Sequence, residues 1–305
     1  MKTTKTTVHP QKISTLQLWW LAIRPKTLPA AFAPILVGTA AAKAADSFQP
    51  AVALLCLLGS LLLQIGVNLA NDYFDGKNQI DSDERRGPLR VTQSGLIAAR
   101  YVQIGIVVSL SLAGLVFIIL GSVGGWPIIL VGIVSVTAAL AYSGGPYPLA
   151  SNGLGEIAVF LFFGLVAVIG TFYLQTGRVS AIACIAAFPP GLLITAVMVV
   201  NNFRDIETDS KAGKRTLAVL LGAQRTKKEY KILVWAGYFV PPLLFLLDMA
   251  GLPVFLPLLT LPLASSLSRK IDCDQSENLN TLLAETARFS LVYSLLFSAG
   301  LVCSL

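Results

Sequence analysis

Charged residues are scarce in this chain. Asp, Glu, Lys and Arg make up 13% of its 305 residues, whereas soluble domains average about 25%. Hydrophobic residues make up 55%, and the mean hydropathy is +0.72. This balance excludes an ordinary soluble protein and predicts an integral membrane protein.

Histidine and cysteine are also rare. The single histidine, His9, lies in a polar N-terminal tail, which excludes histidine-based acid–base chemistry and histidine-ligated metal sites. The cysteines are too widely scattered to form a zinc motif or a disulfide framework; they are Cys56, Cys184, Cys273 and Cys303. Any metal site must therefore be built from carboxylates.

A basic face is missing as well. The net charge of +7 would suit a nucleic-acid partner if the basic residues were clustered. They lie instead in short segments between apolar runs, so we expect no nucleic-acid partner. The environment that this pattern predicts is the lipid bilayer.

Apolar runs long enough to cross a bilayer, about twenty residues each, recur along the chain. They cover residues 28–45, 51–71, 101–120, 125–143, 154–175, 179–202, 230–248, 251–268 and 287–304. With a cytoplasmic N-terminus, all of the 23 Lys and Arg residues except Lys43 and Arg178 fall on the cytoplasmic side. The pattern predicts nine transmembrane helices, with the N-terminus in the cytoplasm and the C-terminus outside.

The chain begins with a polar segment. Residues 1–16 lack the apolar core of a signal peptide, so we expect a flexible tail, followed by a single transmembrane domain over residues 17–305. Trp19 and Trp20, with Arg24 shortly after them, suit an interfacial helix before the first span. This helix either anchors the chain at the membrane surface or also contacts a substrate.

Two groups of carboxylates interrupt the apolar pattern. In the first, Asn68, Asp72 and Asp75 would share one face of a continuous helix, and Asn71 pairs with Asp75 beside them. The second repeats the pattern at spacings of four residues, with Asn201, Asp205 and Asp209. Carboxylates are disfavoured at the C-terminal end of a helix, so we expect a bound divalent cation at these positions.

Oxygen ligands without histidine or cysteine predict Mg²⁺, which usually shares its coordination with substrate phosphates. Basic residues follow each acidic group and would bind the remaining phosphate oxygens; they are Lys77, Arg85, Arg86 and Arg90 after the first, and Lys211, Lys214 and Arg215 after the second. The alternative is that these are solvated loop charges that set the topology. Repetition of the acidic pattern favours a site for a diphosphate.

A turn and an intramembrane acid are further candidates. Tyr142 and Tyr147 flank a Gly-Gly-Pro turn in a loop without basic residues. The Tyr142 ring either shields an allylic carbocation or belongs to an interfacial belt. Glu156, within an apolar run, either has a functional role or is a hydrogen-bonded charge at a helix N-terminus.

These residues resemble a known family. The segments that carry the likeness are NDYFD with Asp81 and GPLR, then NNFRDIETD and GKRTLAVLLG, and also RPKTLPAAFAPILVGTA and YSGGPYPLASNGLGEIAVFLFFG. They resemble the membrane prenyltransferases that alkylate aromatic quinone precursors, and most of all the branch that acts on 1,4-dihydroxy-2-naphthoate. The likeness covers most of residues 24–222.

The resemblance implies an all-helical fold of nine spans around a central cavity, capped by cytoplasmic loops. It also implies that the two motifs bind Mg²⁺ and diphosphate, through Asn68, Asp72 and Asp75 and through Asn201, Asp205 and Asp209. The general superfamily pattern is NxxxDxxxD. In this sequence Asp75 follows Asp72 after three residues instead of four, and Asp81 lies six residues beyond Asp75. A role for Asp81, Asp83 or Glu84 as a ligand stays open.

The implied reaction transfers a polyprenyl or phytyl group from an allylic diphosphate to dihydroxynaphthoate, with loss of CO₂ and diphosphate, in menaquinone or phylloquinone synthesis. The membrane would be a bacterial inner membrane or an internal photosynthetic one, with the active site facing the cytoplasm. The alternative among enzymes is a prenyltransferase for another aromatic acceptor, namely 4-hydroxybenzoate, homogentisate or a porphyrin. A cation-coupled transporter is the alternative from another class, although its acids would be expected near the bilayer midplane.

Overall fold

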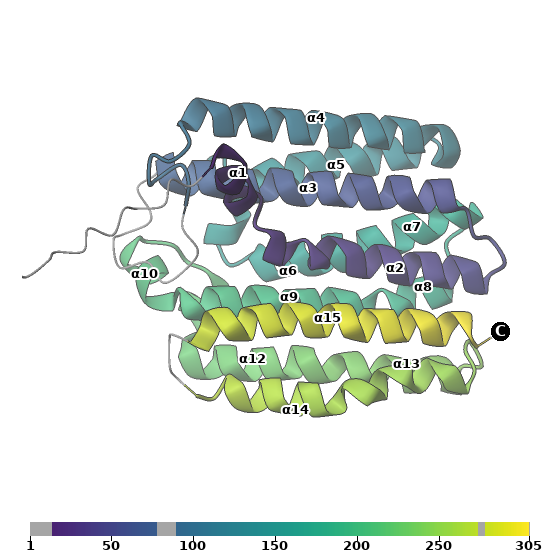
Figure 1. Ribbon diagram of the computed structural model, residues 1–305. Helices are drawn as coiled ribbons and strands as arrows, with labels where there is room; N and C mark the ends of the chain where they lie inside the picture. Colours follow the sequence, from purple (N-terminus) through teal and green to yellow (C-terminus); the bar gives the residue numbers. More distant parts are fainter. Residues whose placement is uncertain (1–13, 78–89, 274–277, 305) are drawn as a thin grey trace, which may run out of the picture.

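A computed structural model of the chain describes residues 14–77, 90–273 and 278–304. Within these ranges the ordered elements are helices, and no strand occurs. Figure 1 shows the longer helices lying side by side along a common direction. The all-helical fold implied by the resemblance is confirmed.

The helices follow the predicted apolar runs, each of which falls largely on one helix or on consecutive helical segments. In chain order they are α1 (Thr15–Ile23), η1 (Pro25–Thr27), α2 (Pro29–Ala44), α3 (Pro50–Lys77), α4 (Ala99–Gly124), α5 (Trp126–Ser143), η2 (Leu149–Ser151), α6 (Gly155–Val159), η3 (Phe160–Val166), α7 (Ala167–Thr176), α8 (Ala181–Ala186), α9 (Phe188–Arg204), α10 (Ile206–Lys211), α11 (Leu217–Leu221), α12 (Ala223–Ala236), η4 (Gly237–Phe239), α13 (Val240–Leu246), η5 (Leu252–Thr260), α14 (Leu261–Lys270) and α15 (Leu279–Val302).

Among the described residues, seven helical stretches are long and apolar enough to cross a membrane. An eighth span results if α1 with η1 and the following α2, bent by 48° relative to each other, are counted as one. The chain is therefore an integral membrane protein. The segment from α12 to α13 is not among these stretches, because α12 begins with the charged sequence AQRTKKEYK. Nine spans and the cytoplasmic N-terminus stay predictions.

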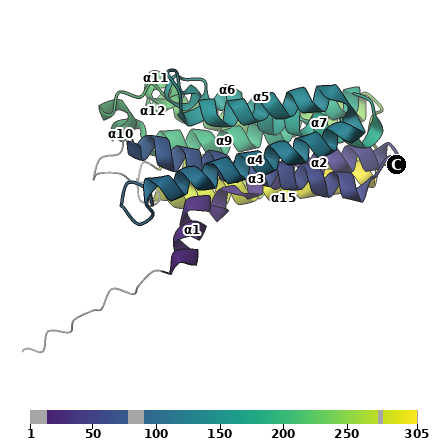
Figure 2. The ribbon, with the colours of Figure 1, turned by 90° about the horizontal axis from the view of Figure 1, so that it is seen from above.

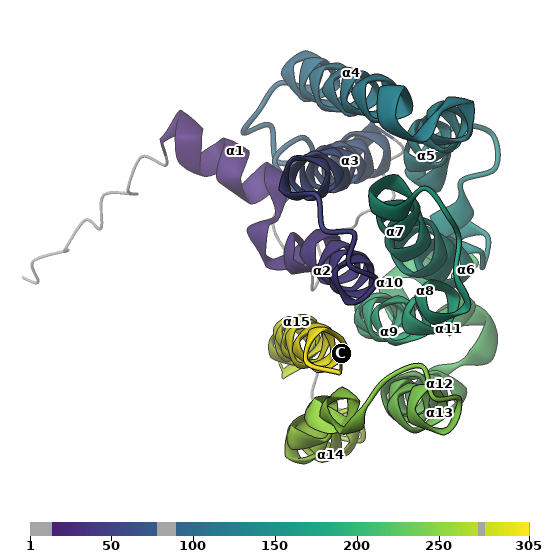
Figure 3. The same cartoon turned by 90° about the vertical axis from the view of Figure 1, so that its right-hand side faces the viewer.

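Helix α1 leaves the side of the bundle, as Figures 2 and 3 show. It begins at Thr15, so the end of the predicted tail is helical, and Ser14 and Gln17 cap it reciprocally. Trp20 is 60% exposed on this helix. Arg24 ends α1 in the left-handed region, with φ 55°, and η1 then carries the chain into α2. The elbow at Arg24 brings the start of α2 beside the polar end of α3.

The largest hydrophobic cluster packs α9 against α2, α12 and α15. Tyr230 of α12 and Tyr293 of α15 are fully buried within it. The Tyr230 hydroxyl is hydrogen-bonded to Thr286 Oγ1 at 2.8 Å, and the Tyr293 hydroxyl donates to Gly237 O at 2.7 Å. Each buried tyrosine thus has a polar partner. This packing fixes α9, the helix whose end carries the second acidic motif.

The π-helical segment η3 approaches α9 backbone to backbone. A methyl group added at Gly164 would lie 2.9 Å from the Gly191 Cα and 3.2 Å from the Ala187 carbonyl oxygen. A methyl group added at Gly191 would meet the Gly164 Cα at the same 2.9 Å. Glycine at both positions therefore allows the α6–α7 span to lie directly against α9.

We expect Gly164→Ala to lower the unfolding temperature of the detergent-solubilised protein. The atoms that the methyl group would meet are backbone atoms, which cannot move aside as a flexible side chain can, and overpacking typically costs about 1–3 kcal/mol. Gly114→Ala in α4 is the matched control, because no atom of the described residues lies within 4 Å of its added methyl group. Equal unfolding temperatures for the two variants would contradict the tight-contact explanation.

Candidate active site

Helix α3 continues without a break through the first acidic motif to Lys77. Asn68, Asp72 and Asp75 therefore lie on one face, as predicted. They are 3%, 2% and 8% exposed, so both carboxylates are buried rather than solvated loop charges. Buried carboxylates require charged or hydrogen-bonding partners, and the surrounding elements supply them.

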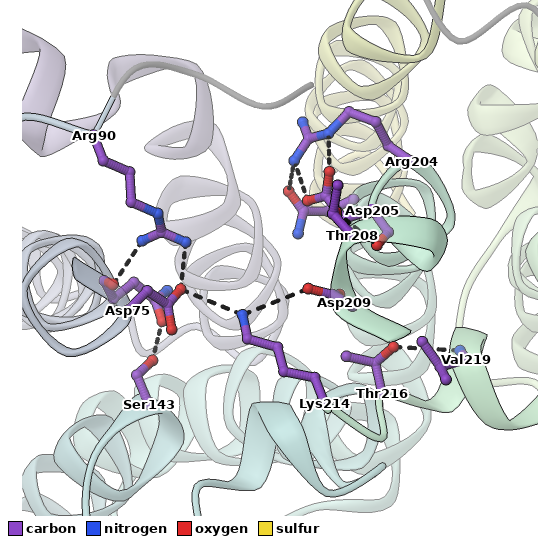
Figure 4. Close-up of polar contacts among 12 residues, drawn as sticks. Asp75, Arg90, Ser143, Arg204, Asp205, Thr208, Asp209, Lys214, Thr216 and Val219 are labelled. Carbon is purple, nitrogen blue, oxygen red and sulfur yellow. Dashed lines mark hydrogen bonds and ion pairs between the residues drawn. The ribbon is translucent and has the colours of Figure 1, made fainter. Parts of the chain in front are cut away.

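Asp75 is held by two cations. Arg90, which follows the first motif in sequence, pairs with the Asp75 Oδ2 and donates from Nη1 to the Asn71 carbonyl oxygen at 2.6 Å. Lys214 reaches the same carboxylate from the other motif, with its Nζ 3.5 Å from the Asp75 Oδ2. Figure 4 shows Arg90 and Lys214 approaching Asp75 from different sides.

Lys214 joins the two acidic motifs. Its Nζ lies 3.6 Å from the Asp209 Oδ1 as well as 3.5 Å from Asp75, and Figure 4 shows it between the two carboxylates. Segments that are far apart in sequence thus meet around one cation at the same end of the bundle. This is the arrangement expected if both motifs form a single site.

The second motif is not one straight helix. Helix α9 ends at Arg204, Asp205 forms the junction, and Asp209 lies in the short helix α10. Arg204 donates to both carboxylate oxygens of Asp205, at 2.8 and 2.6 Å, and to the Asn201 Oδ1 at 3.0 Å. Arg204 is 4% exposed, so this buried guanidinium neutralises Asp205 and orients the Asn201 side chain.

Asp72 has one carboxylate oxygen satisfied and one that is not. Its Oδ2 accepts hydrogen bonds from the Thr92 backbone N–H at 3.3 Å and the Thr92 hydroxyl at 3.2 Å. Its Oδ1 is buried without a hydrogen-bond partner among the described residues. A buried carboxylate oxygen without a donor is costly and fits an atom that ligates a cation.

The donor set fits Mg²⁺ together with a phosphate. In the described part of the chain, no three His, Cys, Asp or Glu side chains are close enough to hold a metal by themselves. Mg²⁺ usually takes only one or two carboxylates from a protein and completes its shell with phosphate oxygens and water. Asp72, Asp75 and Asp209 offer such oxygens, and Lys214 and Arg90 offer cations for the phosphate charge.

An apolar cavity of about 270 Å³ lies beside this polar cluster. Asn68, Asn71 and Asn201 line its polar part, and the rest of its wall includes Ile35 and Leu174 among many apolar side chains. A long hydrocarbon chain would bury its surface in such a cavity. The polar residues mark where a charged head group would lie.

Tyr142 and Glu156 lie near this cavity. Tyr142 lines it, and its hydroxyl is 3.3 Å from the Met198 Sδ. Glu156 accepts a hydrogen bond from the Asn202 Nδ2 at 2.7 Å, and its other oxygen is buried without a partner among the described residues. Glu156 is therefore tied to the end of α9, next to the second motif.

A family model described as the UbiA prenyltransferase family matches residues 31–294. The chain belongs to this family. It is similar over nearly its full length to enzymes named 1,4-dihydroxy-2-naphthoate octaprenyltransferase. The one from Haemophilus influenzae is 37% identical over 298 residues, covering 94% of this chain and 96% of the relative. The one from Mycobacterium tuberculosis is 39% identical over 285 residues, covering 93% and 96%.

Solved structures of the UbiA fold agree in architecture. A UbiA homologue from Archaeoglobus fulgidus bound to DMAPP and Mg²⁺ has a TM-score of 0.65 at 18% identity, covering 94% of this chain and 99% of that one. A UbiA homologue from Archaeoglobus fulgidus bound to GPP and Mg²⁺ has a TM-score of 0.63 at 16% identity, covering 92% of this chain and 99% of that one. At these identities the likeness shows the fold.

The other candidate residues of this UbiA-family chain whose side chains the structure describes form no hydrogen bond or ion pair with the carboxylates of the two acidic motifs. Asn71 accepts a hydrogen bond from Ser143 at the end of α5, and Arg215 has an exposed side chain while its backbone N–H donates to the Ser151 carbonyl oxygen at 2.9 Å. Asn68 donates toward the α1–α2 elbow, as described below. The candidates that lie outside the part whose side chains the structure describes are Lys77, Asp81, Asp83, Glu84, Arg85 and Arg86.

Some site residues were not singled out from the sequence. Arg204 had a signal, because it stands inside the motif between Asn201 and Asp205. Thr92 and Ser143 had none, since they reach the first motif from other elements of the fold. Their contacts depend on packing that residue spacing does not encode.

The Asp209 carboxyl, in the short helix α10, has a perturbed pKa. Burial raises its pKa from the usual 3.8 to about 6; nearby Lys214 opposes the rise, and the charges of Asp205 and Asp75 add to it. The folded protein therefore binds a proton at Asp209 more readily than the unfolded chain does. Ionisation of Asp209 thus lowers stability as the pH rises from about 4 through about 6.

We expect this titration to be visible in the substrate-free protein. The unfolding temperature of the wild type, relative to that of Asp209→Asn, should rise when the pH is lowered from about 7 to about 5, because only the wild type gains the proton. Thermal unfolding of both proteins across this range is the measurement. A difference between them that stays constant with pH would contradict the raised pKa.

Proposed function

We propose that this protein transfers a long prenyl group from an allylic prenyl diphosphate to 1,4-dihydroxy-2-naphthoate, with loss of CO₂ and diphosphate, and that the reaction depends on Mg²⁺. The observation that carries the proposal is Lys214 lying between Asp75 and Asp209 beside an apolar cavity. A metal–diphosphate head group and a hydrocarbon tail would match these two adjoining environments.

The comparisons support the choice of substrates. The relatives from Haemophilus influenzae, Escherichia coli and Mycobacterium tuberculosis, at 36–39% identity, are named for dihydroxynaphthoate as acceptor. The related solved structures hold prenyl diphosphates with Mg²⁺. The acceptor and the metal are therefore proposed for this chain on the strength of its relatives.

In this proposal Lys214 and Arg90 would bind diphosphate oxygens, and the carboxylates of Asp72, Asp75, Asp205 and Asp209 would hold Mg²⁺. Bound Mg²⁺ would supply charge stabilisation of the leaving diphosphate. The C–O bond of the donor breaks with its electron pair going to diphosphate, and the ring carbon that carries the carboxylate forms the new C–C bond. The bond to CO₂ then breaks and returns its electron pair to the ring, so the product remains a quinol.

The cavity wall has two roles in this reaction. Its apolar side chains exclude water, which would otherwise capture the allylic cation. The Tyr142 ring, which lines the cavity, would stabilise the cation through its face. Asn71, Asn201 and Glu156 would keep the head-group region polar and ordered.

We also propose an orientation of the chain in the membrane. Nine spans with a cytoplasmic N-terminus would place both acidic motifs on the cytoplasmic side, where soluble substrates arrive. The predicted excess of Lys and Arg on that side supports this orientation. The host membrane would be a bacterial inner membrane or an internal photosynthetic one.

An acceptor panel tests the function. Purified protein in detergent, one all-trans polyprenyl diphosphate and Mg²⁺ would be incubated with dihydroxynaphthoate, 4-hydroxybenzoate or homogentisate, and the lipid products identified by mass spectrometry. We expect a decarboxylated prenyl naphthoquinol from the first acceptor and far slower reaction with the others. Preferential prenylation of another acceptor, or no prenylation of any, would overturn the proposal.

A further inference from the structure

One face of α3 lines the cavity with polar side chains on successive turns. Ser60, Gln64 and Asn68 are spaced four residues apart, and all three border the cavity. Gln64 is 8% exposed and Asn68 is 3% exposed. Gln64 is outside the acidic motif, and the proposed chemistry of metal and diphosphate does not use it.

The orientation of the Asn68 amide is determined by its partners. Its Nδ2 lies 2.7 Å from the Ile23 carbonyl oxygen and 2.9 Å from the Thr27 Oγ1. The Ile23 carbonyl only accepts, and the Thr27 hydroxyl hydrogen is donated to the Arg24 carbonyl oxygen at 2.9 Å. Both Asn68 amide hydrogens are therefore used at the elbow, which leaves its Oδ1 as the group that faces Gln64.

The orientation of Gln64 follows from that of Asn68. The Gln64 Nε2 is 3.4 Å from the Asn68 Oδ1 and 3.2 Å from the Thr27 Oγ1, and both of these oxygens must accept. Rotating the amide would place its oxygen against two acceptors, so the Gln64 Oε1 is fixed as the atom on the other side. This Oε1 is buried and has no hydrogen-bond partner among the described residues.

A buried carbonyl oxygen of this kind needs a ligand that donates a hydrogen bond. A prenyl diphosphate consists of a hydrocarbon tail, which forms no hydrogen bonds, and a diphosphate, whose oxygens accept them. Dihydroxynaphthoate has two phenolic hydroxyls, which donate. Resting on the function proposed above, we infer that the Gln64 Oε1 accepts a hydrogen bond from a phenolic hydroxyl of the aromatic acceptor, so that Gln64 determines acceptor specificity.

This placement orders the two substrates along one helix. Gln64 precedes Asp72 by about two turns and Asp75 by about three, so the ring would lie along the cavity wall next to the diphosphate end of the donor. The polar network through Asn68 and Thr27 would keep Gln64 in position. Asn68, predicted to bind diphosphate, thus acts on the acceptor side by orienting Gln64.

Binding of acceptor analogues tests the inference. Dissociation constants would be measured for dihydroxynaphthoate and for the 1-hydroxy and 4-hydroxy 2-naphthoates, which each lack one hydroxyl. Wild-type protein should bind one of the two analogues about three- to tenfold more weakly than dihydroxynaphthoate, the range of a single neutral hydrogen bond. In Gln64→Met this discrimination should disappear, whereas the dissociation constant of the prenyl diphosphate should not change.

Ser60→Ala is the matched control. Ser60 lies one turn before Gln64 on the same face, and its hydroxyl donates to the Ala31 carbonyl oxygen at 3.1 Å, so its removal should leave discrimination as in the wild type. Gln64→Asn keeps the amide, but its shorter side chain moves the amide oxygen away from the cavity, so this variant should also lose discrimination between the analogues. It replaces Gln64→Met as the test if the Met variant does not fold.

Undiminished discrimination in the folded Gln64 variants would overturn the inference and leave Gln64 with a water or a structural role. In that case the protein would still prenylate dihydroxynaphthoate, so the proposed function would stand. A wild-type protein that neither binds nor prenylates dihydroxynaphthoate would overturn both.

Discussion

Replacing Asp72 with Asn is expected to lower turnover by roughly 10³-fold, which corresponds to about 4 kcal/mol of transition-state stabilisation. The Asp72 Oδ1 is buried and has no hydrogen-bond partner in the described part of the chain, and the Asp72 Oδ2 already accepts hydrogen bonds from Thr92. An amide of equal size can keep the Thr92 hydrogen bonds but not the charge that a Mg²⁺ ligand supplies. Prenyl transfer under saturating substrates is the measurement.

The control for this variant is Asp46→Asn. Asp46 lies in the turn after α2 with φ 54°, a left-handed conformation that Asn tolerates well. Asp46→Asn makes the same chemical change as Asp72→Asn but away from the acidic motifs, so the activity of this variant should stay near that of the wild type. Near-normal turnover in a folded Asp72→Asn protein would show that Asp72 is not a ligand.

Replacing Lys214 with Gln should raise the KM for the prenyl diphosphate by about ten- to a hundredfold. Charge-assisted hydrogen bonds contribute about 1.5–3 kcal/mol each, and Lys214 is the cation that both motifs share. We expect the KM for dihydroxynaphthoate to change little, since the aromatic acceptor is proposed to bind along the wall of α3 instead.

Lys228→Gln is the matched control for charge. Lys228 is exposed on α12 and is predicted to lie on the same side of the membrane, so this variant removes one positive charge from that side without touching the site. Its donor kinetics should equal those of the wild type. If Lys214→Gln also kept wild-type donor kinetics but inserted with altered topology, Lys214 would serve the positive-inside pattern rather than the substrate.

Residue spacing predicted the local geometry of the first acidic motif. Because α3 continues through Asp75, the shared face of Asn68, Asp72 and Asp75 could be derived from helical periodicity alone. The apolar runs were also recognisable, since transmembrane helices must be long and apolar. The repeated motif further indicated that two distant segments form one site, and Lys214 between Asp75 and Asp209 is consistent with it.

The contacts between elements could not be predicted in this way. The four-residue spacing of Asn201, Asp205 and Asp209 repeats that of a helix face. In the structure the helix ends before Asp205, and the Arg204 side chain donates to the Asp205 carboxylate. The resemblance implies that Asn68 belongs to the diphosphate site, which stays a prediction; residue spacing did not reveal that its amide hydrogens are directed to the elbow after α1. These details depend on how helices pack, which is a property of the whole fold.

The central claim is that both acidic motifs act together on one metal–diphosphate complex. Its most direct test is the affinity for a non-hydrolysable prenyl diphosphate analogue, measured with Mg²⁺ and with EDTA in the wild type, in Asp72→Ala, in Asp205→Ala and in the double variant. We expect binding that requires Mg²⁺, a large loss in each single variant, and a double variant scarcely weaker than either, because interdependent ligands give non-additive losses. Full affinity in a single variant, or a double variant that loses the sum of two independent effects, would contradict the shared site.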